Sequence, residues 1–134
     1  MTFQIINPES LGAPKGWNNG LLAPAGGRVL FVAGQDARDA SGKVTATGIV
    51  DQFAQVLDNL LTVVREAGGK PGHIGRLTIY VTDLEAYVTN RKPIGEAYRK
   101  RMGRHYPAMA LVEVKALMES NALIAVEATA VLPS

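Results

Sequence analysis

The sequence has no cysteine among its 134 residues. Secreted domains of this size are often held together by disulfides, so the absence favours a reducing compartment, and we expect a cytoplasmic protein. The absence also excludes thiolate nucleophiles and cysteine zinc sites. The two histidines, His73 and His105, lack metal-ligand spacing with each other and with clustered carboxylates, so no metal site is predicted.

Long apolar runs and strong charge are missing as well. A membrane-spanning helix needs about 20 apolar residues, whereas the longest apolar stretch, 122–132, is interrupted by Glu127. The first residues lack the basic segment and apolar run of a signal peptide. The net charge of +2 is too small to indicate nucleic acid binding, and the low charged fraction of 19% mildly favours an oligomer.

The residues that are present indicate one domain over 1–134, which is an ordinary domain length. The clearest element is a helix over 49–67, in which apolar residues recur at helical spacing from Phe53 to Val64. Polar residues, Gln52 among them, fall largely on the opposite side of that helix. The other predicted elements are strands over 28–33, 74–81, 109–114 and 122–132, a turn over 39–43 and a second helix over 92–102.

This order of elements predicts an α+β fold, with a mixed sheet and two helices covering one of its faces. The opposite face still has to be buried, so association through it is expected, and that would place clefts between subunits. The last strand is small or apolar on both faces apart from Glu127, which suggests a strand covered on both sides. A carboxylate in such a strand is desolvated and suited to holding or transferring a proton.

Five short motifs occur in an order and spacing that resemble the YjgF/RidA family, and the resemblance extends from Gly16 to Val131. The motifs are Leu-Asp-Asn-Leu within 55–60, Glu-Ala-Gly at 66–68, Val-Thr-Asp-Leu at 81–84, Tyr-Pro-Ala-Met-Ala-Leu-Val-Glu-Val at 106–114, and Val-Glu-Ala at 126–128. The resemblance implies a chorismate-mutase-like domain that forms a homotrimer with three clefts between subunits. It also implies a small-molecule substrate, hydrolysis of reactive enamines and imines such as 2-aminoacrylate, and no metal or organic cofactor.

The main departure from the family is Met109. Active deaminases of the family carry an arginine at this place in the signature, and the planar guanidinium of that arginine can bind a substrate carboxylate through two hydrogen bonds. A thioether cannot form this contact. We therefore expect weak or absent hydrolysis of 2-aminoacrylate, unless another cation takes over the role of anchor.

The resemblance assigns further site residues one by one. Glu127 matches the family's site glutamate and is the predicted catalytic residue. Gly34 matches a glycine whose backbone lines the cleft, and Trp17 replaces a family tyrosine. Arg91 or Lys92 falls near a family asparagine, with one inserted residue nearby, and either cation could bind the substrate in place of the missing arginine.

Structural roles for these residues remain open alternatives. Glu127 could be a salt-bridged sheet residue, Trp17 a packing residue, and Arg91 with Lys92 a solvated helix start. Two other functions also remain open, a non-catalytic trimer that binds a small ligand and an RNA-binding or ribonuclease-like protein that uses the basic run 99–105. Nucleic acid binding is the less favoured of these, because the run has no interleaved aromatic pair.

Overall fold

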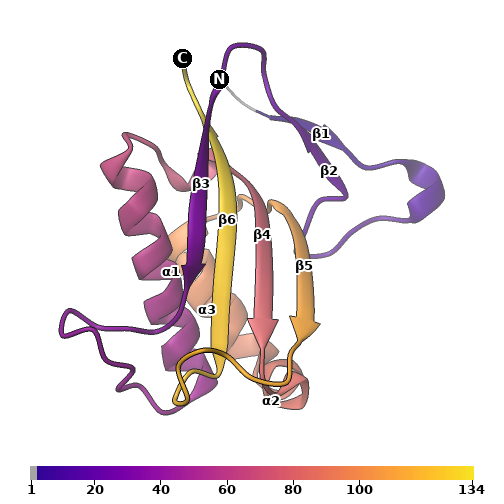
Figure 1. The fold of residues 1–134 in the computed structure, drawn as a ribbon. Helices are drawn as coiled ribbons and strands as arrows, with labels where there is room; N and C mark the ends of the chain where they lie inside the picture. The colour runs from indigo at the N-terminus through magenta and orange to yellow at the C-terminus, as the bar shows by residue number, and fades with distance from the viewer. Residues whose placement is uncertain (1–2) are drawn as a thin grey trace.

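A four-stranded mixed sheet forms the centre of the computed structural model, which describes residues 3–134 (Figure 1). The strand order is β3 (Arg28–Gln35), β6 (Ile124–Leu132), β4 (Ile74–Val81) and β5 (Ala108–Glu113). β6 is antiparallel to both of its neighbours, and β4 and β5 are parallel. The predicted α+β fold with a mixed sheet is confirmed.

Two helices, α1 (Ile49–Glu66) and α3 (Arg91–Met102), cover one face of the sheet (Figure 1). Both were predicted to within one residue. A short helix, α2 (Leu84–Thr89), lies at the end of the sheet where only a turn was expected. The Asp83 side chain caps it by accepting a hydrogen bond of 3.2 Å from the Ala86 N–H, which satisfies one of the free donors of the first turn.

The segment before β3 forms a small hairpin that the sequence did not reveal. β1 (Gln4–Ile6) pairs antiparallel with β2 (Gly20–Leu22), and two 3₁₀ turns, η1 (Glu9–Leu11) and η2 (Pro71–His73), complete the list of elements. Asn18 joins this hairpin to the start of β5, because its N–H donates to Pro107 O at 3.1 Å and its Nδ2 to Tyr106 O at 2.6 Å. The loop before β2 is thereby held against the edge of the main sheet.

The apolar core fills the space between the sheet and the two long helices. α1 supplies most of it, through fully buried residues such as Phe53, Leu57 and Leu60. Gln52 also points into this core and is only 1% exposed, so its assignment to the polar side of the helix was wrong. Its amide replaces missing backbone partners, because it donates to Ala46 O and Asn121 O at 2.8 and 2.9 Å and accepts from the Leu123 N–H at 2.8 Å.

The opposite face of the sheet is open within this chain. Residues of β4 alternate as predicted, with Leu77 and Ile79 buried under the helices and Thr78 on the open face. Phe31 of β3 is 81% exposed there, and Glu127 of β6 is exposed as well. Within residues 3–134 only one face of β6 carries helices, so the expected cover on its other face would have to come from a second copy of the chain. Within residues 3–134, no helix has the length and apolar character to cross a membrane.

Candidate active site

A cavity of about 530 Å³ lies between α3, the start of β5 and the loop that carries Trp17. Much of its lining is apolar and includes Phe53, Ile79, Ile94 and Leu111. The hydrogen bonds of Asn18 to the residues before β5 hold the Trp17 loop in place, and the indole is 44% exposed at the cavity. This volume is within the range of small-molecule sites, which is about 300–1,000 Å³.

Tyrosines form a neutral aromatic wall in this cavity. The rings of Tyr98 and Tyr106 stack with centroids 5.4 Å apart, and the Tyr98 hydroxyl donates to His105 O at 2.6 Å. Burial raises the pKa of Tyr98 and of Tyr87, so both phenols stay protonated at neutral pH. The wall therefore offers ring surface to a ligand and carries no negative charge.

Three cations, Lys15, Arg91 and Arg99, also line the cavity, and no carboxylate of residues 3–134 does. None of the three salt bridges found within residues 3–134 involves any of them. Arg91 is partly held, because its Nε donates to Val88 O at 3.2 Å at the end of α2. An apolar cavity with unpaired cations is suited to a ligand that has an apolar body and an anionic group.

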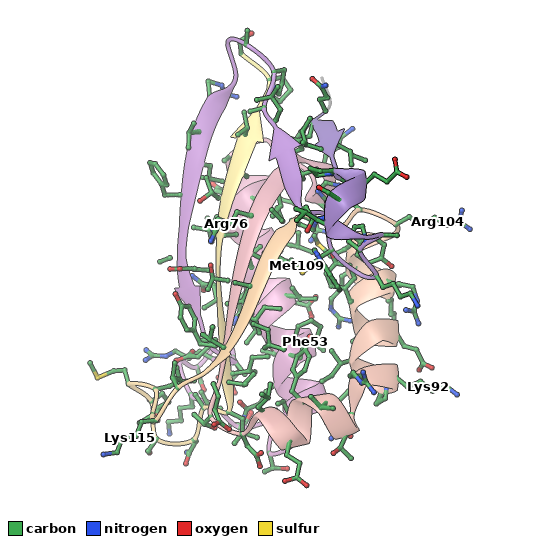
Figure 2. The ribbon with its side chains drawn as sticks, turned by 90° about the vertical axis from the view of Figure 1, so that its right-hand side faces the viewer. Phe53, Arg76, Lys92, Arg104, Met109 and Lys115 are labelled. Carbon is green, nitrogen blue, oxygen red and sulfur yellow. The ribbon has the colours of Figure 1, made fainter. Side chains whose placement is uncertain are left out.

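The structure brings Trp17, Met109 and Arg91 together in this cavity. Met109 lies opposite Leu77 in the β4–β5 pair, so its side chain is on the face of the sheet that the helices cover. Lys92 does not line the cavity and extends outward from α3, away from the sheet (Figure 2). Of the two candidate replacement cations, only Arg91 is therefore placed to meet a ligand here.

Glu127 lies on the other face of the sheet, in a second hollow of about 450 Å³. Its Oε1 accepts a hydrogen bond of 2.7 Å from the Tyr80 hydroxyl, and this bond to the carboxylate raises the pKa of Tyr80. Arg76 and Thr78 line the same hollow. Within residues 3–134, no element covers this carboxylate and it forms no salt bridge, so it is exposed in the single chain.

Gly34 stands beside Glu127 at an irregularity of the sheet. Val32 pairs with Ala128 and Gln35 with Val126, so two residues of β3, Ala33 and Gly34, face Glu127 alone. Such a β-bulge bends the strand and leaves backbone groups without ladder partners, and bulges of this kind often occur next to active sites. A Cβ placed on Gly34 would meet no atom within 4 Å, so the backbone here is open to a ligand.

The two groups of predicted site residues face opposite sides of the sheet. Figure 2 shows Met109 on the side of α3 and Arg76, a neighbour of Glu127, on the far side. Within one chain, Glu127 and Gly34 therefore cannot contact a ligand in the cavity that Met109, Trp17 and Arg91 line. A site that uses all of them requires a second copy of the chain.

Sequence reasoning did not assign Lys15, Arg99 and Tyr80, among others, to these two clusters. Arg99 had a detectable signal, because Arg91, Gly95 and Arg99 are spaced four residues apart and so share one face of a helix. Tyr80 also had one, since it alternates with buried Ile79 and Val81 on a strand. Lys15 is in a loop, and nothing in the sequence pairs it with α3.

The basic run 99–105 does not form one continuous surface. Arg101 pairs with Asp58 of α1 at 2.8 Å, and Arg99 turns into the cavity. The His105 ring bonds to Ile74 O at 2.6 Å. Arg104 extends outward (Figure 2). Within residues 3–134, no three histidine or acidic side chains are grouped closely enough to hold a metal ion.

Comparison with known proteins gives consistent matches over nearly the whole chain. The sequence model of the endoribonuclease L-PSP family matches residues 10–132. A RutC family protein of Pyrococcus horikoshii is 32% identical over 95% of this chain and 96% of its own length. The 2-iminobutanoate/2-iminopropanoate deaminase of Escherichia coli is 33% identical over 78% of this chain and 80% of its own length. The crystal structure of a conserved Rid family protein from Yersinia pestis superposes with a TM-score of 0.86, at 33% identity, over 98% of this chain and all of that one.

Proposed function

The chain belongs to the endoribonuclease L-PSP family, which is the YjgF/RidA family, and from this premise we propose that it hydrolyses a reactive enamine or imine of an amino acid. The reaction would take place in clefts between the subunits of a homotrimer in the cytoplasm. The observation that carries the proposal is the cavity with unpaired cations, Arg91 and Arg99, beside an aromatic wall. The Escherichia coli relative that is named a 2-iminobutanoate/2-iminopropanoate deaminase supports this reaction class.

The open face of the sheet supports the subunit arrangement. Val29 and Phe31 are 56% and 81% exposed there, and exposed apolar surface of this kind marks an interaction site when it is contiguous. In the proposed trimer this face meets the cavity side of the next copy. Glu127 of one copy then reaches the cavity of its neighbour, and its carboxylate becomes desolvated by association rather than by its own chain.

The proposed chemistry needs one carboxylate and one hydroxyl. Water adds to the carbon of the protonated imine (C=NH₂⁺) while Glu127 accepts a proton from it, and a neutral tetrahedral carbinolamine forms. Glu127 then returns this proton to the nitrogen, and the C–N bond breaks as the carbinolamine hydroxyl gives its proton back to Glu127, so that a 2-oxo acid and ammonia leave. The Tyr80 hydroxyl, 2.7 Å from Glu127 Oε1, orients the carboxylate and completes its hydrogen bonding during this transfer.

The reaction can be tested on imines that an L-amino acid oxidase generates from alanine, leucine and phenylalanine. We expect ammonia release above the spontaneous rate for at least one of them, and a kcat that falls about a hundredfold in Glu127→Gln, since general acid–base catalysis contributes about 10²–10⁴-fold. Light scattering of the same variant should still give the mass of a trimer. A Glu127→Gln protein that is trimeric and hydrolyses every imine as fast as the wild type would contradict the proposal.

Substitution of Met109 separates two explanations of the missing arginine. If Met109 alone limits the enzyme, Met109→Arg restores hydrolysis of 2-aminoacrylate. The cavity already holds three unpaired cations, so a fourth would repel them and lose apolar contact with the ligand. We therefore expect Met109→Arg to lower turnover of whichever imine the wild type hydrolyses, and an increase would show that no replacement anchor exists.

The second candidate function is a non-catalytic trimer that binds a small ligand. The exposure of Glu127 in the single chain supports this candidate, because an exposed carboxylate is less suited to general acid–base catalysis. It predicts ligand binding in the cavity without ammonia release from any imine. An RNA-binding role has weaker support, because Asp58 and the cavity engage two cations of the basic run.

A further inference from the structure

We propose that Arg99 is the carboxylate anchor of the cavity, and that its ligand is a monocarboxylate with a bulky apolar, preferably aromatic, side chain. Under the proposed function, on which this inference rests, the substrate would be the 2-imino acid of an aromatic or large branched amino acid. Arg99 stands two turns along α3 from Arg91, about 12 Å along the helix axis.

The position of Arg99 depends on a glycine in the middle of α3. A Cβ added at Gly95 would lie 3.1 Å from Arg99 Nη1 and 3.8 Å from both Cζ and Nη2. The guanidinium therefore rests directly over Gly95, along the helix surface and at the cavity. Glycine destabilises a helix interior relative to alanine, and this close approach is a physical reason for its presence.

Arg99 is the cation of the cavity best placed to bind a carboxylate. Arg91 already donates its Nε hydrogen to Val88 O at 3.2 Å, and Lys15 presents a flexible single ammonium from a loop. Within residues 3–134, no salt bridge occupies the guanidinium of Arg99. Its planar group can form two parallel hydrogen bonds with one carboxylate, which a lysine cannot do.

The rest of the cavity determines the ligand's body. Beyond the cations, the wall consists of apolar side chains and tyrosine rings, with Met109 and Leu111 from β5 nearest the edge of the sheet. A three-carbon imino acid would leave most of about 530 Å³ unfilled. A thioether makes favourable contacts with aromatic rings, so Met109 has the character of a contact for the ligand's side chain, where the family's arginine would bind the carboxylate.

Binding can be measured with an unreactive probe, 3-phenylpropanoate, because Trp17 is the single tryptophan of the chain and lies at the cavity. We expect 3-phenylpropanoate to change the tryptophan fluorescence with saturation. Propanoate, which lacks the aromatic body, and 3-phenylpropanamide, which lacks the charge, should each bind at least about tenfold more weakly. Equal binding of propanoate and 3-phenylpropanoate would overturn the assignment of the ligand's body.

Arg99→Met keeps much of the side-chain stem and removes the charge, and Lys100→Met makes the same change at a neighbouring exposed residue outside the cavity. Arg99→Met should weaken 3-phenylpropanoate binding about tenfold to a hundredfold and leave 3-phenylpropanamide unaffected. Lys100→Met should bind both compounds like the wild type. Arg99→Gln provides a second neutral variant in case the methionine perturbs the fold. Wild-type affinity in either Arg99 variant, or the same loss in Lys100→Met, would overturn Arg99 as the anchor.

Ammonia release from imines generated out of phenylalanine and alanine distinguishes this inference from the proposed function. Preference for the phenylalanine imine, lost in Arg99→Met, supports both. Probe binding that depends on Arg99, without ammonia release from any imine, supports the ligand chemistry and refutes the hydrolase. Faster hydrolysis of the alanine imine, unchanged in Arg99→Met, supports the hydrolase and refutes this inference.

Discussion

Replacing Gly95 with alanine should separate the stability of α3 from ligand binding. Alanine in a helix interior is about 1 kcal/mol more favourable than glycine. The added methyl would lie 3.1 Å from Arg99 Nη1, closer than an ordinary van der Waals contact. That atom is the far end of a flexible side chain, so the guanidinium can move aside at little cost. We expect a net stabilisation of about 0.5–1 kcal/mol and a Tm higher by roughly 2–4 °C.

The same movement should weaken binding. A guanidinium displaced by a few tenths of an ångström, or rotated to another conformer, no longer meets the carboxylate with both hydrogen bonds aligned, and hydrogen bonds weaken steeply with misalignment. We expect the affinity of Gly95→Ala for 3-phenylpropanoate to fall about threefold to tenfold, since one of two charge-assisted bonds is impaired. Thermal unfolding followed by circular dichroism and titration of the Trp17 fluorescence measure the two effects on one protein.

A double-mutant cycle provides the control. If Gly95→Ala acts through Arg99, it should cause no further loss of affinity in an Arg99→Met background. An unchanged affinity in the single Gly95→Ala variant would refute the reasoning, because the guanidinium would then not need its place over the glycine. Equal losses in both backgrounds would refute it too, by showing that the methyl affects the ligand directly.

Three further outcomes are expected. Gln52→Leu should destabilise the fold by about 2–3 kcal/mol in urea unfolding, because it leaves three partly buried backbone groups without their side-chain partner, and a loss below about 1 kcal/mol would contradict this. Desolvation, and after it the charge of Lys70, lower the pKa of His73 in the folded state, so the unfolded state binds this proton more readily. The free energy of unfolding should therefore be unaffected by His73 above about pH 6.5 and should fall as the pH is lowered below that value. His73→Gln should flatten this fall in urea unfolding. Tyr80→Phe should lower the kcat for ammonia release by about tenfold through the orientation of Glu127, with unchanged affinity for 3-phenylpropanoate; wild-type kcat would exclude the hydroxyl from the reaction.

The regular elements could be predicted because their apolar residues repeat with one clear period. The sequence placed the strand at 74–81 and the helix at 49–67 almost to the residue, since each buries a single face. The short hairpin of β1 and β2 could not be predicted, because three-residue strands without buried side chains show no alternation of apolar and polar residues. α2 was missed because one and a half turns with no buried residue leave no periodic signal either.

The errors at individual residues have a common cause, which is that their environments come from distant parts of the chain. Gln52 looks like a surface residue by composition, and its burial becomes favourable only through the backbone of the loop before α1 and of the remote loop before β6. The desolvation predicted for Glu127 rested on its apolar neighbours along β6, but no element within residues 3–134 covers its face of the sheet, so this prediction depends on a second copy of the chain. Arg99 belongs to a run of basic residues that predicts a surface patch. The cavity that it lines is formed by the Trp17 loop and β5, which are distant from α3 in the sequence or on another element.

Asn18 has a consequence for the dynamics of the molecule. The Trp17 loop that Asn18 fastens to β5 belongs to the hairpin of β1 and β2. No side chain of this hairpin is buried, since none of the described residues before Val32 belongs to the core. This segment can therefore detach as a separate cooperative unit, by a sub-global opening that leaves the main sheet and its helices intact. Amide hydrogen exchange in β1 and β2 would then be fast relative to β4 and β6. A ligand too large for the mouth of the cavity would enter at the rate of this opening. Loss of the hydrogen bond from Asn18 Nδ2 to Tyr106 O would then change the association rate constant more than the dissociation constant.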